Sequence, residues 1–411
     1  MRNLILLLSV LALVMPASAQ LFVGTGQFNY DDNTDGVATD NQIRIGRSGN
    51  IGAGTYVSGV SAQMAGGANG EIGTGYLDGT NMVLKRGWGS LVMVGGELDI
   101  TPVSGNKSYY FGRNNGTAYI SQVGGTLKIG QFNREILFGA PNTSGGVPTR
   151  ASGLGEAYIE LKDGLMVLRG SPRIGAYRYW KDASALGLAD DMSGSCIGRF
   201  TQTGGTLDNT LASDGQDFFV GFAGADGMAS FLNNSVANLN FLQVGNNGYQ
   251  IYQKSSDGTT VTQDLFGKAV VKVGKDATVT AGNFNLYDSP NTELAIEIAS
   301  LTDFSSIACS GTVNIGALWS SEVADMGPGK LSIDLQGYNP QPGDEWVIVT
   351  GATMNNQAFQ AIVADAPLDK PSWYFDTRVD NGTDLVLFLV PEPATMALLA
   401  LGGLALIRRR R

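Results

Sequence analysis

The sequence predicts an all-β protein, and three observations carry that prediction. The chain has 57 glycines but only 13 prolines, without a strict Gly-X-Y period, which favours short strands joined by tight turns over collagen. Apolar and polar residues alternate along many short segments, as they do in half-buried strands. A strand–turn–strand pattern also recurs along the middle of the chain, which indicates stacked units that bury their apolar faces only against their neighbours.

Each copy of the repeated unit is an alternating strand, a glycine-rich turn where positive φ is tolerated, and a second alternating strand. The turn reads Gly95-Gly96 in the first copy and Asp163-Gly164 in the third. The six copies are Gly89–Ile100, Gly116–Gly130, Gly155–Gly170, Ile197–Leu207, Gly227–Leu242 and Gly267–Gly282. We therefore expect a β-solenoid, specifically a right-handed parallel β-helix, with tandem β-sandwiches built from hairpins as the alternative.

The repeats define a region from residue 20 to residue 293, after which the alternation becomes cleaner. Further strands are expected at Leu294–Ile298, Thr312–Ile315, Lys330–Leu335 and Trp346–Val349, followed by a hairpin between Trp373 and Phe388 that turns at Asp380–Thr383. We interpret residues 294–389 as the closing rungs and cap that shield the last open edge of a solenoid. A separate small β-domain is the alternative, although no proline- or serine-rich linker marks a boundary.

Composition excludes several classes of function. Removing Arg2 and the four C-terminal arginines from the 27 basic residues leaves 22 against 37 acidic ones, so nucleic acid is not an expected partner. Histidine is absent, which eliminates Ser-His-Asp triads and histidine metal sites. Cys196 and Cys309 are too few for the usual zinc sites, and we expect them to be buried free thiols, with a disulfide between them as the alternative in an exported protein. The sequence therefore predicts no catalytic residue, no metal, no cofactor and no enzymatic activity.

The N-terminus has the three parts of a secretory signal peptide. Arg2 precedes an apolar core from Leu4 to Val14, and Ala17-Ser18-Ala19 supplies the A-x-A end that signal peptidase recognises. We predict that residues 1–19 are removed and that the mature chain begins at Gln20.

The C-terminal segment, residues 390–411, also has three parts. Pro391, Glu392 and Pro393 form a stiff, non-helical tripeptide. Residues 394–407 form an uncharged run, predicted to be a short transmembrane helix that covers roughly 21 Å of a hydrocarbon core of about 30 Å. Arg408, Arg409, Arg410 and Arg411 then provide a cytoplasmic stop. Residues 385–390 are apolar as well, but the Pro-Glu-Pro break separates them from the run.

This tail resembles the PEP-CTERM sorting signal of bacterial surface proteins, because its three parts occur in order at the C-terminus. The resemblance implies that a membrane protease-transpeptidase of the exosortase class recognises Pro391, Glu392 and Pro393 and cuts near them, after transient anchoring in the inner membrane. The tail would otherwise stay as a plain anchor. The Gly-rich repeats resemble autotransporter passenger strands and other PEP-CTERM bodies, although the C-terminal membrane barrel of an autotransporter is not predicted here.

Two further segments contain residue types that are found in ligand-binding sites. Asp31–Gly36 begins like a calcium loop, but its twelfth position is Gln42, which has no carboxylate, so a solvated acidic turn is the preferred interpretation. A long insertion places charged residues beside aromatic ones, which suits either sugar binding or packing on the solenoid. Its candidates are Arg173, Tyr177, Arg178, Tyr179, Trp180, Lys181, Asp182, Asp190 and Asp191.

Two functions from different classes remain. The first is an exported, non-enzymatic structural or adhesive protein of the cell surface or extracellular matrix. The second is a secreted protein on the same scaffold that binds or degrades extracellular polysaccharide. The lack of histidine and of any convergent motif favours the first.

Overall fold

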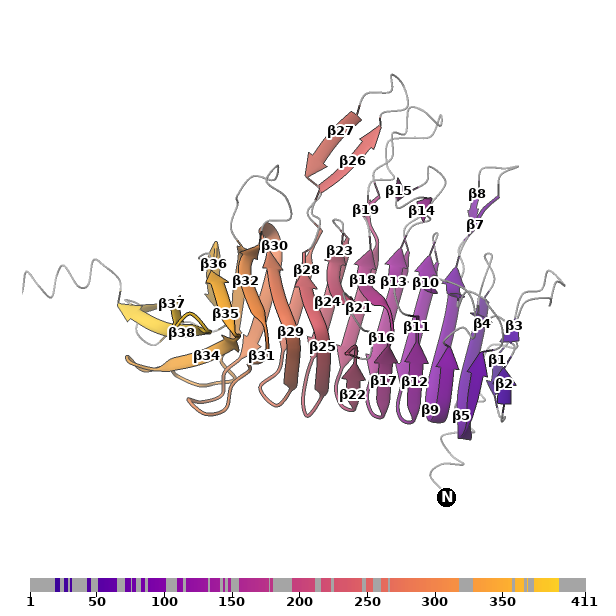
Figure 1. The fold of residues 1–411 in the computed structure, drawn as a ribbon, viewed down its shortest axis with the longest axis horizontal. Coiled ribbons are helices and arrows are strands. Elements are labelled where there is room, and N and C mark those ends of the chain that lie inside the picture. The colour runs from indigo at the N-terminus through magenta and orange to yellow at the C-terminus, as the bar shows by residue number, and fades with distance from the viewer. Residues whose placement is uncertain are drawn as a thin grey trace, which may run out of the picture.

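We analysed a computed structural model of the chain, which describes residues 88–100, 109–113, 116–131, 134–140, 155–176, 194–210, 216–222, 225–245, 267–317, 328–356, 359–365 and 373–391, with shorter strand pieces between residues 19 and 85, between 143 and 264, and at 368. Every named element is a strand, and the strands stack into an elongated coil (Figure 1). Among the described residues, no helix is long and apolar enough to span a bilayer. The predicted transmembrane helix at residues 394–407 lies outside the described residues.

The coil is built from three parallel ladders, which the chain visits in the order A, B, C in each turn. Ladder A contains β1 (Ala19–Phe22), β5 (Ile51–Met64), β9 (Trp88–Ile100), β11 (Thr117–Gln122), β16 (Glu156–Leu161), β21 (Ile197–Gln202), β24 (Asp226–Phe231), β28 (Ala269–Val273), β30 (Ser289–Glu297), β33 (Pro328–Asp334) and β36 (Ala361–Ala364).

Ladder B continues from ladder A after a corner, and β5, β9, β25 and β29 each belong to two ladders. Besides β5 and β9, ladder B contains β2 (Gly26–Phe28), β12 (Thr126–Ile129), β17 (Leu165–Leu168), β22 (Thr206–Asp208), β25 (Val236–Val244), β29 (Thr278–Tyr287), β31 (Ile307–Cys309) and β34 (Glu345–Thr350).

Ladder C closes each turn. It contains β3 (Tyr30–Asp31), β4 (Ile43–Ile45), β6 (Glu71–Thr74), β10 (Tyr109–Arg113), β13 (Glu135–Ala140), β18 (Ser171–Ala176), β23 (Asp217–Phe222), the second halves of β25 and β29, β32 (Thr312–Ala317) and β35 (Thr353–Asn356). The predicted parallel solenoid is therefore confirmed, and the alternative of tandem sandwiches is wrong for the described strands. The right-handed sense of the coil stays a prediction from the rule for parallel crossovers.

Glycine is required at the corners of the coil because neighbouring turns are separated by only one strand spacing. Gly205, at the corner between ladders A and B, has φ +64°, and an added Cβ would lie 2.6 Å from the carbonyl oxygen of Gly164. Gly139, at the end of a ladder-C strand, has φ +71°, and its Cβ would lie 2.0 Å from the carbonyl oxygen of Ile197. The glycine-rich turns of the repeats are therefore corners that stack on one another, not hairpin turns.

The core runs through the middle of the coil, where alternate residues of all three ladders point inward. Two buried glutamines support the corner between ladders A and B. The Nε2 of Gln202 donates hydrogen bonds to the carbonyl oxygens of Gly205 in its own turn and Val236 in the next, each at 3.0 Å. Gln122 makes the same pair of bonds two turns earlier, so the side chains connect successive corners.

Among the described residues, four small antiparallel hairpins interrupt the coil at a single type of position, after a ladder-C strand and before the next ladder-A strand. Figure 1 shows them along one side of the molecule. They pair β7 (Tyr76–Asp78) with β8 (Val83–Lys85), β14 (Thr143–Ser144) with β15 (Val147–Pro148), β19 (Arg178–Tyr179) with β20 (Gly194–Ser195), and β26 (Tyr249–Gln253) with β27 (Thr260–Asp264).

Residues 294–389 continue the three ladders before the pairing changes to antiparallel. Residue 294 lies inside β30, so the repeats and the closing turns share one ladder. At the end of the coil, β38 (Asp384–Pro391) inserts between β34 and β37 (Trp373–Asp380) and pairs antiparallel with both. Its inward residues Leu385, Leu387 and Leu389 join the continuous core. We call β34, β37 and β38 the cap.

Candidate functional site

The predicted sorting motif begins on the last residue of the folded cap. Pro391 is the final residue of β38 and pairs with Trp373, the first residue of β37. Glu392 and Pro393, together with the arginines at residues 408–411, lie outside the described residues. No spacer therefore separates the cap from the motif that an export enzyme would recognise.

The turn and the alternation of the hairpin explain why β38 forms here. Asn381 and Gly382 have φ values of +54° and +74°, as required at the two central positions of a type I′ turn. Residues 385, 387 and 389 are buried leucines, which selects the strand register that seals the coil. The apolar segment at residues 385–390 is therefore a strand of the cap and contributes its leucines to the protein core.

Charged side chains join β37 to β34 across the intervening β38. Arg378 donates two hydrogen bonds to Glu345, at 3.0 and 2.7 Å, and its Nε donates one to Asp380 at 2.8 Å. The hydrogen bonds from Arg378 lower the pKa of Glu345 and of Asp380, and those two carboxylates raise the pKa of Arg378. All three groups are solvent-exposed, so this cluster orients the cap strands but is screened by water.

The predicted signal peptidase site is only partly within the described residues. Ala19 and Gln20 are the first two residues of β1 and pair with Ala53 and Gly54 of β5, whereas Ala17 lies outside the described residues. A cut between Ala19 and Gln20 would leave Gln20 paired in ladder A.

The insertion with mixed charges and aromatics does not form one site among the described residues. Arg173 lies on β18, where its guanidinium is 2.8 Å from Glu135 and its Cζ is 3.9 Å from the ring centroid of Phe222. Arg178 and Tyr179 form the short strand β19. The remaining candidates lie outside the described residues: Tyr177, Trp180, Lys181, Asp182, Asp190 and Asp191. Of the calcium-like loop, only Asp31 is described, in β3.

An aromatic stack on ladder A was not anticipated from the sequence. The rings of Tyr119 and Tyr158 are 5.0 Å apart and nearly parallel, and Trp88 lies 5.7 Å from Tyr119. Tyr119 and Tyr158 are register partners on β11 and β16, which produces their stack, whereas Trp88 on β9 is the register partner of Thr117 and its ring is tilted against Tyr119. The contact between Tyr119 and Tyr158 stabilises adjacent turns by about 0.5–1.5 kcal/mol.

A row of polar side chains crosses the outer face of ladder C. The amide of Asn355 donates to Asn314 at 2.8 Å, and Asn314 donates to Asn285 at 2.7 Å. At the other end, Gln243 accepts a hydrogen bond from the Tyr287 hydroxyl at 2.7 Å and donates to Asp217. Partial burial raises the pKa of Asp217 to about 6, against the opposing effects of Gln243 and Arg173.

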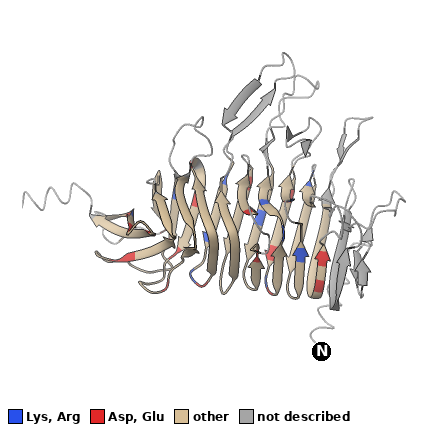
Figure 2. Ribbon diagram, viewed as in Figure 1, with Lys and Arg blue, Asp and Glu red and all other residues tan. Residues whose placement is uncertain are grey.

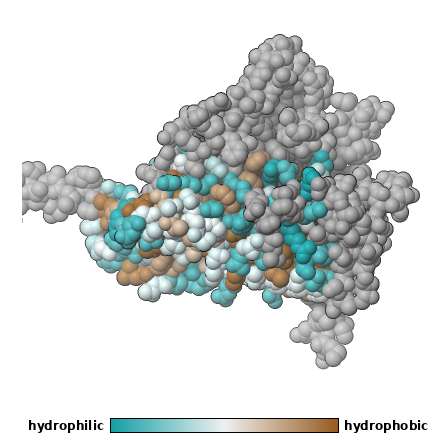
Figure 3. Space-filling model, viewed as in Figure 1, coloured by the Kyte–Doolittle hydropathy of each residue, from teal (hydrophilic) through white to brown (hydrophobic). Residues whose placement is uncertain are grey.

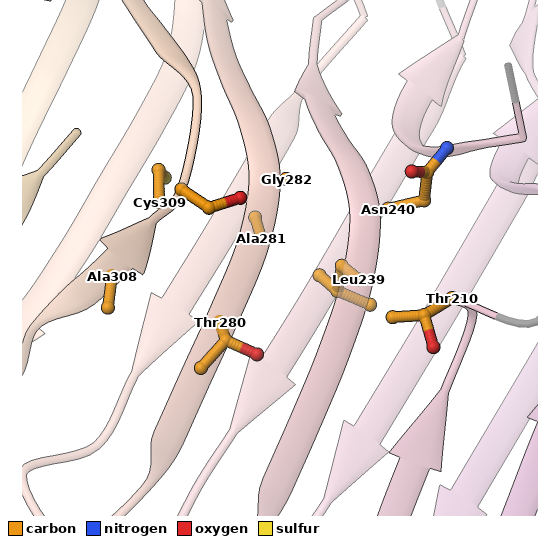
Figure 4. A pocket seen from close by; sticks show the side chains of 9 residues that line it. Thr210, Leu239, Asn240, Thr280, Ala281, Gly282, Ala308 and Cys309 are labelled. Carbon is orange, nitrogen blue, oxygen red and sulfur yellow. The ribbon is translucent and has the colours of Figure 1, made fainter. Parts of the chain in front are cut away.

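A surface pocket of about 490 Å³ lies where β25 and β29 bend from ladder B to ladder C (Figure 4). Its rim carries hydroxyl and amide groups, and Leu239 and Ala281 form part of its wall. Cys309 also lines it, but burial raises the pKa of that thiol to about 12, which makes it a poor nucleophile at neutral pH. The polar lining residues are Thr210, Asn240, Thr280 and Ser310. None of the described residues that line the pocket is charged.

The described residues contain no group of three His, Cys, Asp or Glu side chains able to hold a metal ion. Cys196 and Cys309 are both free thiols, which confirms that part of the prediction, but only Cys196 is buried and Cys309 is partly exposed. Among the described residues, acidic and basic residues are scattered along the coil (Figure 2), and hydrophilic and hydrophobic residues are mixed on the face in view (Figure 3).

Comparison with known proteins yields one match. No curated protein and no solved structure matches the chain, so the likeness of its body to autotransporter passengers gains no support. A family model described as the PEP-CTERM protein-sorting motif matches residues 389–411, which include the end of β38. The chain thus ends in a PEP-CTERM sorting motif, which indicates a protein that is exported, transiently anchored in the membrane and sorted through exosortase to the cell surface.

Proposed function

We propose that this chain is a non-enzymatic structural or adhesive protein of the cell surface or extracellular matrix. The observation that carries the proposal is the continuity of the molecule: three parallel ladders lead into a cap whose last strand runs into the sorting motif. A long parallel coil with its end sealed suits a rigid surface element, because each turn is held by its neighbours. Export would begin with removal of residues 1–19 by signal peptidase.

The route can be tested by intact mass measurement of the protein recovered from the native cell surface. We expect a species that begins at Gln20 and lacks the arginine tail. Replacing Pro391, Glu392 and Pro393 by alanine should leave the tail attached and the protein in the membrane fraction. A wild-type surface protein that still carries Arg411 would contradict cleavage and leave the tail as a plain anchor.

The structural role needs a separate measurement. Deleting the gene should weaken cell cohesion or surface attachment, and the full-length gene should restore it. The purified mature protein should leave the length distribution of the native extracellular polysaccharide unchanged. Shortening of that polysaccharide would overturn the non-enzymatic assignment.

A second candidate is binding of extracellular polysaccharide, favoured by the neutral pocket between ladders B and C. Hydroxyl and amide groups around an apolar wall suit an uncharged sugar residue, and the volume falls within the range of ligand sites. Replacing Asn240 or Thr280 by alanine should reduce retention of the protein in gels that contain the polysaccharide. Thr353→Ala, on ladder C outside the pocket lining, is the matched control.

A further inference from the structure

The β37–β38 hairpin has an open end opposite its turn, and this end extends beyond the rest of the cap. We call this open end, residues 373–375 and 389–391, the tip. Strand β34 pairs with residues 384–388 of β38, whereas Leu389, Val390 and Pro391 pair only with β37. The residues opposite them are Phe375, Tyr374 and Trp373 in that order. The tip is therefore a two-stranded end that carries three aromatic residues, of which Phe375 is buried, and it leads directly towards the predicted membrane run.

The length of chain after the tip limits how far it can lie from the bilayer. Only Glu392 and Pro393 separate Pro391 from Ala394, the first residue of the apolar run. Three fully extended residue steps span at most about 10 Å. The apolar run itself is roughly 9 Å shorter than a hydrocarbon core of about 30 Å. With the arginines at the cytoplasmic boundary, Pro391 therefore reaches no further than about the outer edge of the hydrocarbon core.

The side chains at the tip suit a position at the outer edge of the hydrocarbon core. Tyr374 is 40 % exposed, and Trp373 is partly buried against the core. Tryptophan and tyrosine are the residues enriched where protein meets the headgroup layer, because an apolar ring is combined with a polar group. The nearest described carboxylates on the cap strands, Glu345 and Asp376, lie opposite Phe388, about 10 Å along the strand from Pro391.

We infer that the tip of the β37–β38 hairpin is a lipid-interface contact, in which Trp373 and Tyr374 lie in the headgroup layer while the precursor is anchored. The inference rests on the proposed function in one respect, since it requires the anchored precursor. The contact orients the cap at the membrane surface, where the motif must be presented to a membrane enzyme. Cleavage beyond Pro391 would remove the anchor and leave β38 and its core leucines in the mature protein.

Quenching of tryptophan fluorescence by brominated lipid tests the contact. The full-length precursor would be reconstituted into vesicles of phosphatidylglycerol and phosphatidylethanolamine, with bromine on the acyl chains near the headgroup. Trp373→Phe should remove more than half of the bromine-dependent quenching. Trp346→Phe is the matched control, because Trp346 lies in the same cap but is only 1 % exposed.

A second variant preserves every residue of the cap and the Pro-Glu-Pro tripeptide. Twelve Gly-Ser residues inserted between Pro393 and Ala394 would allow the tip to move away by about 20 Å. Quenching should then fall to the level of Trp373→Phe. Equal quenching in Trp373→Phe and Trp346→Phe, or unchanged quenching after the insertion, would overturn the inference.

Membrane insertion is measured on the same samples by flotation after carbonate washing. A wild-type precursor that fails to float with the vesicles would refute the anchoring step of the proposed function. A precursor that floats but shows no quenching from Trp373 would refute the lipid contact alone.

Discussion

Arg378 on β37 and Glu345 on β34 form a two-point ion pair across β38, with their closest atoms 2.7 Å apart. These strands do not pair with each other, because β38 lies between them. The pair therefore connects the two outer strands of the cap over the strand that leads into the sorting motif.

Separating this pair should destabilise the cap slightly. A double-mutant cycle with Arg378→Ala and Glu345→Ala should give a coupling of roughly 0.2–1 kcal/mol, since both groups are exposed and screened by salt. The folded pKa of Glu345 is lowered, so its contribution is present above the unfolded pKa and is lost as pH falls through the folded pKa. Urea unfolding at a series of pH values from 7 downwards measures both effects. A coupling that does not weaken towards the acid end of the series would contradict this account.

Truncation of a cap leucine should have a much larger effect. Leu387 is fully buried in the core, so Leu387→Ala should lower the free energy of unfolding by about 2–5 kcal/mol. Tyr374→Ala, on the neighbouring strand but exposed, should change it by no more than about 0.5 kcal/mol in the absence of membrane. Thermal unfolding followed by circular dichroism distinguishes the two variants. Similar melting temperatures would show that β38 does not seal the core.

The stacked corners predict which glycines tolerate a side chain. Gly139→Ala combines positive φ with a Cβ 2.0 Å from the carbonyl oxygen of Ile197, so the backbone must shift and folding should fail or weaken severely. Gly337 also has positive φ, +78°, but no atom lies within 4 Å of its added Cβ. Gly337→Ala should therefore cost only about 1–2 kcal/mol of backbone strain. If the two variants lose similar amounts of unfolding free energy, then backbone strain, and not the close approach of the added Cβ, determines which residues are tolerated at the corners.

Asp217 should make the stability of ladder C depend on pH. Its folded pKa is raised to about 6, above the unfolded value of about 3.9, so the folded state binds more protons between these values. Stability should therefore fall as pH rises from 4 to 6, and Asp217→Asn should flatten that part of the profile. Denaturant unfolding at several pH values checks the prediction. An unchanged slope in Asp217→Asn would assign the dependence to another group.

Much of the fold was predictable from particular residues. The alternation on both sides of Gly124-Gly125 predicts two strands joined by a turn, and the structure has β11 and β12 there. Likewise, Asp380–Thr383 predicts the turn between β37 and β38. Which strands pair could not be predicted, because a hairpin and a coil share the period of two and differ only in contacts between residues far apart in sequence.

The aromatic stack on ladder A and the row of amides on ladder C could not be predicted from the sequence, for the same reason. The stack of Tyr119 on Tyr158 and the hydrogen bond from Asn314 to Asn285 depend on strand register across turns that have insertions of different length. Nothing local to either residue specifies its partner. Equally spaced aromatics or amides in corresponding copies were the only available signal, and irregular spacing obscured it.

The sequence alone determined the all-β class, the glycine-rich turns, the closing hairpin and the sorting motif, because alternation, turn residues and a three-part tail are local properties. Tertiary structure decided that the glycine-rich turns are stacked corners, and it fixed the parallel pairing and the stacking of the aromatic and amide rows, because these depend on contacts between residues far apart in sequence. It also decided what the closing hairpin covers: only the position of β38 between β34 and β37 buries Leu385, Leu387 and Leu389 at the open end of the coil.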